Sequence, residues 1–214
     1  MADKFAIITG ASTGIGFELA TLAAKDGYDI LVVANEALIQ SAAADFKQFG
    51  TDVTAVEADL LVTTGGASVG DHDLVQPALK AAGGSVDFWR IALRPGKPMM
   101  AGRLGETVVL SLPGNPVSAF VTATLFVRPL IAHLAGAAEP LPTPIPAILG
   151  EDLPANGPRI DYLRAAMLDG RVHAAAIQDS SMLLTLARST CLIVRPGSAP
   201  VAKAGESAEI LVIA

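Results

Sequence analysis

Short apolar runs alternate with helical patterns over the first two-thirds of the chain. Runs of strand length occupy residues 5–9, 29–33, 52–57, 60–64 and 107–112. Helical spacing of apolar residues reaches Lys25 after the first run, covers residues 37–49, ends near Ala82 after the fourth, and fills residues 117–134. Such alternation is typical of an α/β fold with a parallel sheet between two layers of helices. We therefore predict a three-layer, parallel-sheet α/β domain.

The last quarter of the chain has a different pattern. Residues 139–146 contain four prolines, which predicts an extended and stiff linker. Beyond it, apolar runs at residues 159–168 and 171–177 flank Asp169-Gly170, a dipeptide that favours a hairpin turn. Further strands are predicted at residues 191–194 and 209–213, with a short helix at residues 181–187. The pattern predicts a second, mostly β domain.

Composition favours a folded protein in a reducing compartment. Of the 214 residues, 51% are hydrophobic and 17% are charged, so the chain can bury the core of one or two domains. The single Cys191 excludes an internal disulfide, and the N-terminus lacks the features of a signal peptide, which predicts a cytoplasmic location. The apolar segment 117–134 contains Arg128, Pro129 and His133, so we expect a buried helix and no membrane span.

The charge distribution narrows the class of ligand. A net charge of −6 argues against nucleic-acid binding, which needs an excess of Lys and Arg. Residues 84–104 are locally basic, because they hold Arg90, Arg94, Lys97 and Arg103 against the single acid Asp87. A local basic cluster in an acidic protein suits a small anionic ligand.

A glycine-rich turn, Thr-Gly-Ala-Ser-Thr-Gly-Ile-Gly at residues 9–16, joins the first predicted strand to the first helix. Such glycines let a pyrophosphate approach the backbone at a helix N-terminus, and Glu36 after the second strand could accept hydrogen bonds from ribose hydroxyls. Residues 2–60 thus resemble the start of a short-chain dehydrogenase/reductase, which implies a Rossmann-like fold and an NAD(P) cofactor. The residues that this resemblance assigns to the cofactor are Gly10, Ser12, Gly14, Ile15, Gly16, Glu36 and Asp59.

The family's proton-transfer residues are missing after residue 60. There is no Asn-Asn-Ala-Gly segment, and neither tyrosine begins a Tyr-x-x-x-Lys pair, since Val32 follows Tyr28 and Ala166 follows Tyr162 at that spacing. We therefore favour a structural role for the glycine turn over a working cofactor site, roughly two to one.

Three further motifs carry candidate chemistry. Residues 63–73 read Thr-Thr-Gly-Gly-Ala-Ser-Val-Gly-Asp-His-Asp, in which Asp71 and Asp73 either cap a helix or hold Mg²⁺, while His72 is expected to be solvated. Arg90 and Arg94 are predicted to share one face of an extended segment, 86–94, with Lys97 in the rigid turn that follows. Together they could grip phosphate or molybdate, or they could form a solvated basic face.

The third motif is Leu-Pro-Gly-Asn-Pro-Val-Ser at residues 112–118. Asn115 is a favoured N-cap, Pro116 fits the first helical turn, and Gly136 supplies a stop for the helix that follows. Pro129 is expected to kink this helix, because its ring removes one backbone donor. Two prolines around Gly-Asn also predict a preformed loop that loses little entropy when a ligand binds.

In this order, the three motifs resemble molybdopterin molybdenumtransferase, and the resemblance covers residues 60–214, including a small C-terminal β-barrel. It implies hydrolysis of adenylylated molybdopterin and insertion of molybdate, with Mg²⁺ assisting, in a homodimer. Asp73 would be the catalytic acid and would share the metal with Asp71. The residues assigned to the substrate are Gly65, Gly66, Ser68, Arg90, Arg94, Lys97, Pro113, Asn115 and Pro116.

The two resemblances meet abruptly. Only Ala58 and Asp59 separate the strand that ends at Glu57 from the strand that begins at Leu60, although parallel strands need a crossover of a dozen or more residues. Either these runs form one long strand or one of them leaves the sheet, and we interpret the chain as chimeric. The predicted parts are a nucleotide-binding half at 1–59, a molybdopterin-binding-like half at 60–138, the linker 139–146 and the barrel at 147–214.

Three functions remain open at this point. The chain is a molybdenum-cofactor enzyme, partial or inactive because earlier domains of the family are missing, or an NAD(P)-binding protein without the catalytic pair, or a non-catalytic module that joins transferase subunits. Sequence coverage favours the first of these, since it accounts for the larger part of the chain.

Overall fold

A computed structural model describes residues 4–34, 36–65 and 74–213. The chain forms two compact units that interleave along the sequence. Unit 1 comprises Met1–Thr63, Asp73–Phe88 and Met100–Leu110, and unit 2 comprises Thr64–His72, Trp89–Met99 and Ser111–Ala214. The domain boundaries expected at residues 59, 138 and 146 stay predictions, because the two units are defined by contacts and not by consecutive segments.

The beginning of unit 1 confirms the predicted alternation of strands and helices. The elements are β1 (Phe5–Thr9), α1 (Gly14–Lys25), β2 (Asp29–Ala34), α2 (Leu38–Lys47) and β3 (Val53–Glu57). The strands pair in parallel in the order β1-β2-β3, and Phe17 and Phe46, from α1 and α2, place their ring centroids 4.9 Å apart. The buried core beneath the helices includes Ala20, Ala24, Ile30, Val32, Ile39 and Phe46.

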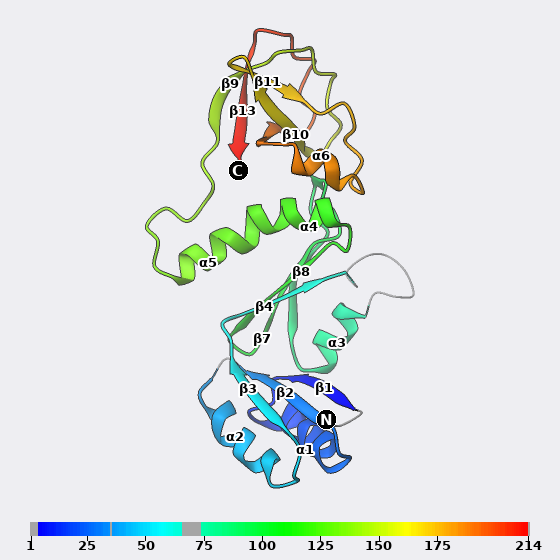
Figure 1. The fold of residues 1–214 in the computed structure, drawn as a ribbon, viewed down its shortest axis with the longest axis vertical. Coiled ribbons are helices and arrows are strands. Elements are labelled where there is room, and N and C mark those ends of the chain that lie inside the picture. The colour runs from blue at the N-terminus through cyan, green and yellow to red at the C-terminus, as the bar shows by residue number, and fades with distance from the viewer. Residues whose placement is uncertain (1–3, 35, 66–73, 214) are drawn as a thin grey trace. The chain divides into compact units, whose positions relative to one another are not determined.

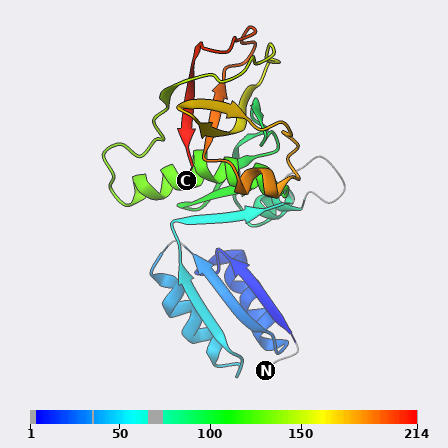
Figure 2. The same cartoon turned by 45° about the horizontal axis from the view of Figure 1, so that its top comes forward.

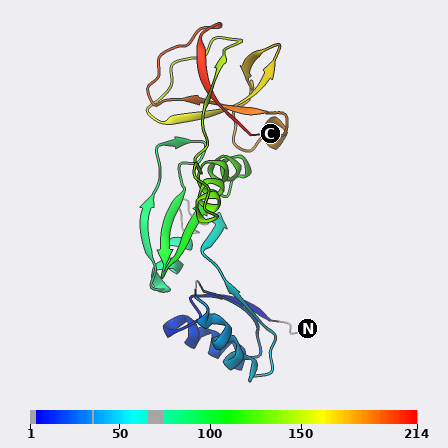
Figure 3. The ribbon, with the colours of Figure 1, turned by 90° about the vertical axis from the view of Figure 1, so that its left-hand side faces the viewer.

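The three-layer prediction is wrong for this sheet, because α1 and α2 lie on the same face (Figure 3). Both crossovers run in the same direction along the strand order, and right-handed crossovers of that kind place both helices on one side. The other face keeps Phe5 and Ile7 each 63% exposed, so it has no covering layer among the described residues.

A second sheet follows and corrects the expectation of a single parallel sheet. It contains β4 (Leu60–Thr64), β5 (Ser85–Trp89), β7 (Met100–Leu104) and β8 (Thr107–Leu112) in the order β4-β8-β7-β5, with α3 at Val75–Ala81 (Figure 1). The link through Ala58 and Asp59 is too short for a crossover, so β4 leaves the first sheet. It pairs with β8 instead, where the Val108 N–H donates to the Asp59 oxygen at 2.9 Å.

The second sheet is mixed and not purely parallel. At the far end of the β4–β8 pair the Gly65 N–H donates to the Leu112 carbonyl at 3.0 Å, so β4 and β8 run in the same direction. Only Gly105 and Glu106 separate β7 from β8, and a connection of two residues joins antiparallel strands.

One long helical segment follows β8. It consists of α4 (Pro116–Thr122), a π-helical turn (Ala123–Val127) and α5 (Arg128–Leu134). The predicted start and stop are confirmed, since Asn115 occupies the N-cap position without a side-chain capping bond and Gly136 has a φ of 82°. The wide π turn ends at Val127, two residues before Pro129, the residue expected to disturb the helix.

The prediction that this helix is buried is wrong for its second half. Val117 and Val121 are fully buried, whereas Ile131 is 54% exposed and Leu134 is 49% exposed. The segment Pro116–Leu134 is long and apolar enough to cross a membrane, with a mean hydropathy of 1.6, and 28% of it is buried. Length and composition alone are weak indicators, and the absence of a membrane partner stays a prediction.

The C-terminal part of unit 2 is built on an antiparallel sheet (Figure 2). Its strands are β9 (Ile145–Ile148), β10 (Ile160–Leu168), β11 (Arg171–Ala174), β12 (Cys191–Arg195) and β13 (Ser207–Val212), in the order β11-β10-β12-β13-β9, with α6 at Leu183–Ala187. The predicted hairpin is confirmed, because Asp169 and Gly170 have φ values of 48° and 74°. The predicted linker ends earlier than expected, since Ile145 and Pro146 belong to β9.

Two further contacts connect β11 with the residues that follow β9. Leu149, directly after β9, bridges Val172 of β11, and the Gly150 N–H donates to the Val172 carbonyl at 2.9 Å. The two ends of the strand order therefore meet. A short strand, β6 (Leu93–Arg94), pairs in parallel with β10 and connects the basic motif to this sheet.

Candidate functional site

Two of the three motifs meet where β4 and β8 end. The hydrogen bond between Gly65 and Leu112 joins them, and a Cβ atom placed on Gly114 would lie 3.2 Å from the Cα of Gly65. The two glycines therefore let the backbones of these loops approach closely. Ligands of α/β proteins bind at the carboxyl ends of parallel strands, so the meeting point is a candidate site.

The loop after β8 offers an uncommitted oxygen. The Oδ1 atom of Asn115 is buried and has no hydrogen-bond partner among the described residues. A buried carbonyl oxygen needs a donor or a cation, so a ligand at this position would gain a bond that the protein leaves open. Pro113 is buried before it and Pro116 begins α4 after it, which keeps the loop rigid.

The predicted metal and catalytic residues cannot be placed at this site. Asp71 and Asp73 lie outside the described residues, as do Gly66, Ser68 and His72. Within the described part of the chain, there is no group of three or more His, Cys, Asp or Glu residues that could hold a metal ion. The Asn115 oxygen is of the hard type that Mg²⁺ prefers, but one oxygen does not make a binding site.

The basic motif folds back on itself. The Arg90 N–H donates to the Met99 carbonyl and the Ile91 N–H donates to the Lys97 carbonyl, both at 3.0 Å. Arg90 has a φ of 66° and its guanidinium lies 4.0 Å from the centre of the Trp89 ring. The prediction that Arg90 and Arg94 share one strand face is wrong, because the strand ends at Trp89 and the chain turns at Arg90.

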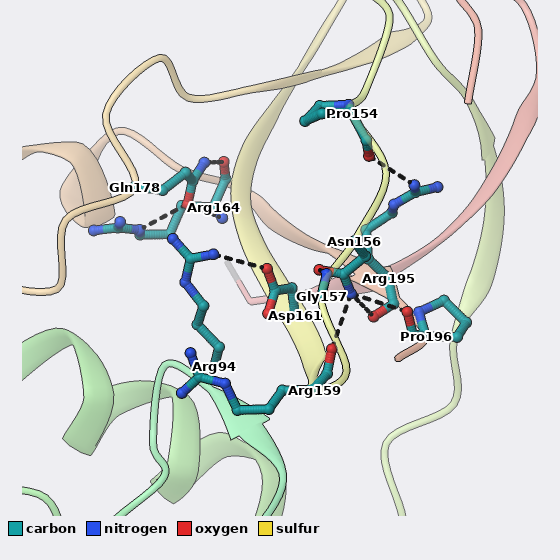
Figure 4. Close-up of polar contacts among 10 residues, drawn as sticks. All are labelled: Arg94, Pro154, Asn156, Gly157, Arg159, Asp161, Arg164, Gln178, Arg195 and Pro196. Carbon is teal, nitrogen blue, oxygen red and sulfur yellow. Dashed lines mark hydrogen bonds and ion pairs between the residues drawn. The ribbon is translucent and has the colours of Figure 1, made fainter. Parts of the chain in front are cut away.

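Arg94 instead faces the C-terminal sheet. Its Nη1 atom donates to Oδ2 of Asp161 at 3.3 Å, and Asp161 stands directly opposite it in the β6–β10 register (Figure 4). The Asp161 side chain is 8% exposed and that of Arg94 is 56% exposed. The ion pair therefore links an exposed cation of the motif to a buried anion that the sequence did not single out.

A buried arginine lies on the same strand as Asp161. Arg164 is 1% exposed, and its Nη1 donates to the Asp179 carbonyl at 2.8 Å. Its Nε donates to Oε1 of Gln178 at 3.4 Å (Figure 4). The Gln178 amide in turn donates to the carbonyls of Arg164 and Ala175. Burial lowers the pKa of the Arg164 guanidinium, and the nearby Asp179 carboxylate offsets part of this. The network fixes the segment between β11 and α6.

Asp179 makes one end of this network sensitive to acid. The Ser181 hydroxyl and backbone N–H, followed by the charge of Arg164, lower the pKa of the Asp179 carboxyl from its ordinary value. Because the folded-state pKa lies below the unfolded value, the ionised carboxylate stabilises the fold above about pH 4, and this contribution is lost as the pH falls through the folded pKa.

We predict that Asp179→Asn reduces the loss of stability between pH 6 and pH 3, about the range in which carboxyl groups titrate. The measurement is urea unfolding at both pH values. Ser181→Ala removes the hydroxyl that contributes most to the lowered pKa of Asp179, so it should also reduce the loss of stability between the two pH values. Equal acid sensitivity of the parent chain and both variants would contradict the assignment.

A further set of polar bonds shapes a cavity of about 390 Å³ beside Arg94 and Asp161. Arg195 is 8% exposed and donates to the Pro154 and Pro200 carbonyls, while the Asn156 amide donates to the carbonyls of Arg159, Arg195 and Pro196 (Figure 4). These donors are committed to the protein backbone. Arg94 is the basic lining residue whose guanidinium is mostly exposed to the cavity and to solvent.

The glycine-rich turn lines a separate cavity of about 290 Å³ within unit 1. The Ser12 hydroxyl donates to the Glu36 carboxylate, and a Cβ on Gly16 would lie 2.2 Å from the Gly10 carbonyl oxygen, so this turn requires glycine there. Asp59 does not line this cavity. The predicted cofactor residues that do are Gly10, Ser12, Gly14, Ile15, Gly16 and Glu36.

The fold defines a class of mixed α/β protein with a C-terminal β domain. Residues 35–133 match the family described as "Probable molybdopterin binding domain", and residues 146–213 match "MoeA C-terminal region (domain IV)". The chain therefore contains MoeA-like molybdopterin molybdenumtransferase domains. The first match begins at residue 35, ahead of the boundary expected at residue 60.

Two similar curated proteins are named molybdopterin molybdenumtransferase. The chain is 36% identical over 160 residues to the molybdopterin molybdenumtransferase of Haemophilus influenzae, a match that covers 72% of this chain and 39% of the relative. It is 32% identical over 157 residues to the enzyme of Staphylococcus aureus strain COL, covering 72% and 38%. The chain thus spans about two fifths of the length of these relatives.

Solved structures support the fold. A molybdenum cofactor biosynthesis protein from Pyrococcus furiosus aligns with a TM-score of 0.57 and 22% identity, over 100% of this chain and 69% of that one. A molybdopterin biosynthesis moeA protein from Pyrococcus horikoshii aligns with a TM-score of 0.54 and 21% identity, over 98% and 52%. At these identities the likeness concerns the mixed α/β fold alone.

Proposed function

We propose that the chain acts in molybdenum cofactor biosynthesis, at the insertion of molybdate into adenylylated molybdopterin. One observation carries the proposal. Gly65 of the first motif, the basic motif and the motif at residues 112–118 belong to unit 2, and the hydrogen bond between Gly65 and Leu112 joins two of these motifs. The matches of residues 35–133 and 146–213 to molybdopterin-related families support the same function.

The roles of the described residues follow from their chemistry. Lys97 and Arg94 are exposed cations of one loop, and Arg90 joins them through the backbone pairing of that loop, so together they would bind the oxyanion. Pro113 and Pro116 would hold the pocket wall around Asn115. Asp73 is proposed as the catalytic acid, with Asp71 and Asp73 as ligands of Mg²⁺, which when bound would neutralise phosphate charge.

The proposed assembly reaches beyond this chain. The match spans about two fifths of the relatives' length, so the full activity would also need the parts of the family that lie outside this match. We propose a cytoplasmic homodimer, a chimeric chain with a Rossmann-like start, and a closed barrel at the C-terminus. The bridge between Leu149 and Val172 supports the closure of that barrel.

Isothermal titration calorimetry with molybdate tests the proposal. We expect saturable binding of molybdate in the presence of Mg²⁺, with sulfate at the same concentration as the control tetrahedral dianion. Binding of neither anion would count against an oxyanion site. Equal affinity for both would reduce the site to a general anion patch.

The cavity at the glycine turn favours a second candidate, a nicotinamide nucleotide bound without turnover. Its volume is near the lower end of the range for small-molecule sites, about 300 to 1,000 Å³, so it would enclose one nucleotide half of the cofactor. Glu36 would accept the ribose hydroxyls, and the N-terminus of the 12-residue helix α1 would face the phosphate.

We predict that NADH binds more tightly than NADPH, because Glu36 would repel a 2′-phosphate. Titration of nucleotide fluorescence measures both affinities. Gly16→Ala should abolish binding, whereas Gly157→Ala, where a Cβ meets open space, should leave it unchanged. Unaltered nucleotide fluorescence with the parent chain would remove this candidate.

A further inference from the structure

The ion pair between Arg94 and Asp161 is set by the backbone on both sides. The β6–β10 register places Arg94 opposite Asp161 and Leu93 opposite Ile160, and the Ile160 N–H donates to the Ala92 carbonyl at 3.0 Å. The backbone therefore places the two side chains next to each other, so forming the ion pair restricts few of their rotamers. Both residues belong to unit 2.

Burial is unequal across the pair. The Asp161 side chain is 8% exposed, so its charge needs a cationic partner, whereas Arg94 is 56% exposed and would otherwise move freely in solvent. The buried arginines nearby are engaged elsewhere, Arg164 with Gln178 and Asp179, and Arg195 with backbone carbonyls. Among the described residues, Arg94 is the one that forms an ion pair with Asp161.

One bond leaves most of the guanidinium available. Only Nη1 of Arg94 donates to Asp161, and a guanidinium has five N–H donors. Arg94 lines the cavity of about 390 Å³ and its side chain is 56% exposed, so the remaining donors are accessible to a ligand. A buried carboxylate that holds one edge of an arginine reduces the entropy that the side chain loses when its other edge binds an anion.

We propose that Asp161 is a positioning residue, which holds Arg94 in the orientation that binds the substrate oxyanion. The inference rests on the proposed function, because it takes the anion to be molybdate or a phosphate group. Asp161 itself does not touch the anion. Its negative charge also lowers the positive potential at Arg94, and the two effects change affinity in opposite directions, so the sign of the measured change separates them.

A double-mutant cycle on the full chain tests the proposal with molybdate as the probe. We expect Asp161→Ala to weaken molybdate binding about tenfold in the parent chain and to have no effect in the Arg94→Ala background. Asp161→Asn keeps a hydrogen-bond acceptor but removes the negative charge, so this variant should lose less molybdate affinity than Asp161→Ala. Asp87→Ala, which breaks the exposed ion pair with Arg103 and does not line this cavity, is the matched control and should leave affinity unchanged.

Two outcomes would overturn the proposal. Equal weakening by Asp161→Ala with and without Arg94 would show a general structural effect. Tighter binding in Asp161→Ala would show that the carboxylate competes with the anion. If the alanine variant fails to fold, Asp161→Asn carries the same cycle with a smaller expected change.

The positioning of Arg94 by Asp161 can also be tested without a ligand, so that its failure is distinguishable from failure of the proposed function. In ¹⁵N NMR spectra, the guanidinium of Arg94 should rotate slowly in the parent chain and rapidly in Asp161→Ala, with its signals assigned by their loss in Arg94→Ala. Slow rotation in the parent chain without any molybdate binding would leave the positioning intact and refute the oxyanion site. Rapid rotation in the parent chain would refute the positioning itself.

Discussion

Gly96→Ala is expected to destabilise the chain and to abolish anion binding by the basic motif. Gly96 has a φ of 124°, a region that only glycine occupies without strain, and a Cβ there would lie 2.5 Å from Cγ2 of Thr122 and 2.8 Å from Cδ2 of Leu93. Both neighbours are buried and cannot move aside freely. Backbone strain and overpacking together should cost about 4 kcal/mol.

The loss of binding follows from the same geometry. Gly96 lies between Arg94 and Lys97, and its carbonyl accepts from the Met99 N–H at 3.2 Å, so a shift of this residue moves both cations. Urea unfolding measures the stability and calorimetry measures molybdate affinity. Gly136→Ala is the matched control, because Gly136 also has a positive φ of 82° but a Cβ there meets open space.

The comparison of the two glycines is decisive. Gly136→Ala should cost only about 1 kcal/mol, the conformational penalty without the steric one. Similar losses of stability in both variants would mean that the packing of Thr122 and Leu93 against the motif is not as described.

The second large effect is expected for Arg164→Ala, with a loss of about 3 kcal/mol in the free energy of unfolding. The side chain of Arg164 is among the largest that are fully buried, so its truncation leaves a cavity. It also removes a donor from Oε1 of Gln178 and from the Asp179 carbonyl. Chemical denaturation monitored by circular dichroism gives the value.

Arg188→Ala is the control, because it removes an exposed arginine instead of a buried one. Arg188 follows α6 and is exposed, so its truncation should change stability by less than about 0.5 kcal/mol. A neutral result for Arg164→Ala would contradict the account, since it would mean that the buried guanidinium network contributes nothing to the C-terminal sheet.

Local signals in the sequence predicted the elements well. The Asp169-Gly170 hairpin and the glycine turn before α1 were predicted because each depends on the backbone freedom of a few adjacent residues. The helix after β8 begins at Pro116 and stops before Gly136 for the same reason. Short-range chemistry fixes such features whatever the rest of the chain does.

Long-range pairing was not predictable in the same way. The sequence left open whether Leu60–Thr64 would continue the first sheet, and the answer depended on β8, which lies more than forty residues further along. The sequence also could not predict that half of Pro116–Leu134 is exposed, because the apolar pattern of a helix is the same whether or not another element covers it.

The missed site residues had one usable signal. Asp161, Arg164 and Arg195 are charged residues within otherwise apolar strands, and a charge in such a run is expected to be paired. The sequence could not identify the partners, since Arg94 reaches Asp161 across 67 positions of the chain. The substrate and metal assignments on residues 66–73 stay predictions, because those residues lie outside the described ones.

We propose that the chain carries a transferase-like site for an anionic pterin nucleotide. The most direct measurement is the thermal melt of the full chain alone, with NADH, with NADPH, and with Mg²⁺ plus adenylylated molybdopterin, because a ligand that binds the native state raises the midpoint. The account predicts the larger rise with the pterin nucleotide. A rise with the nicotinamide nucleotides alone, or no cooperative transition, would contradict it.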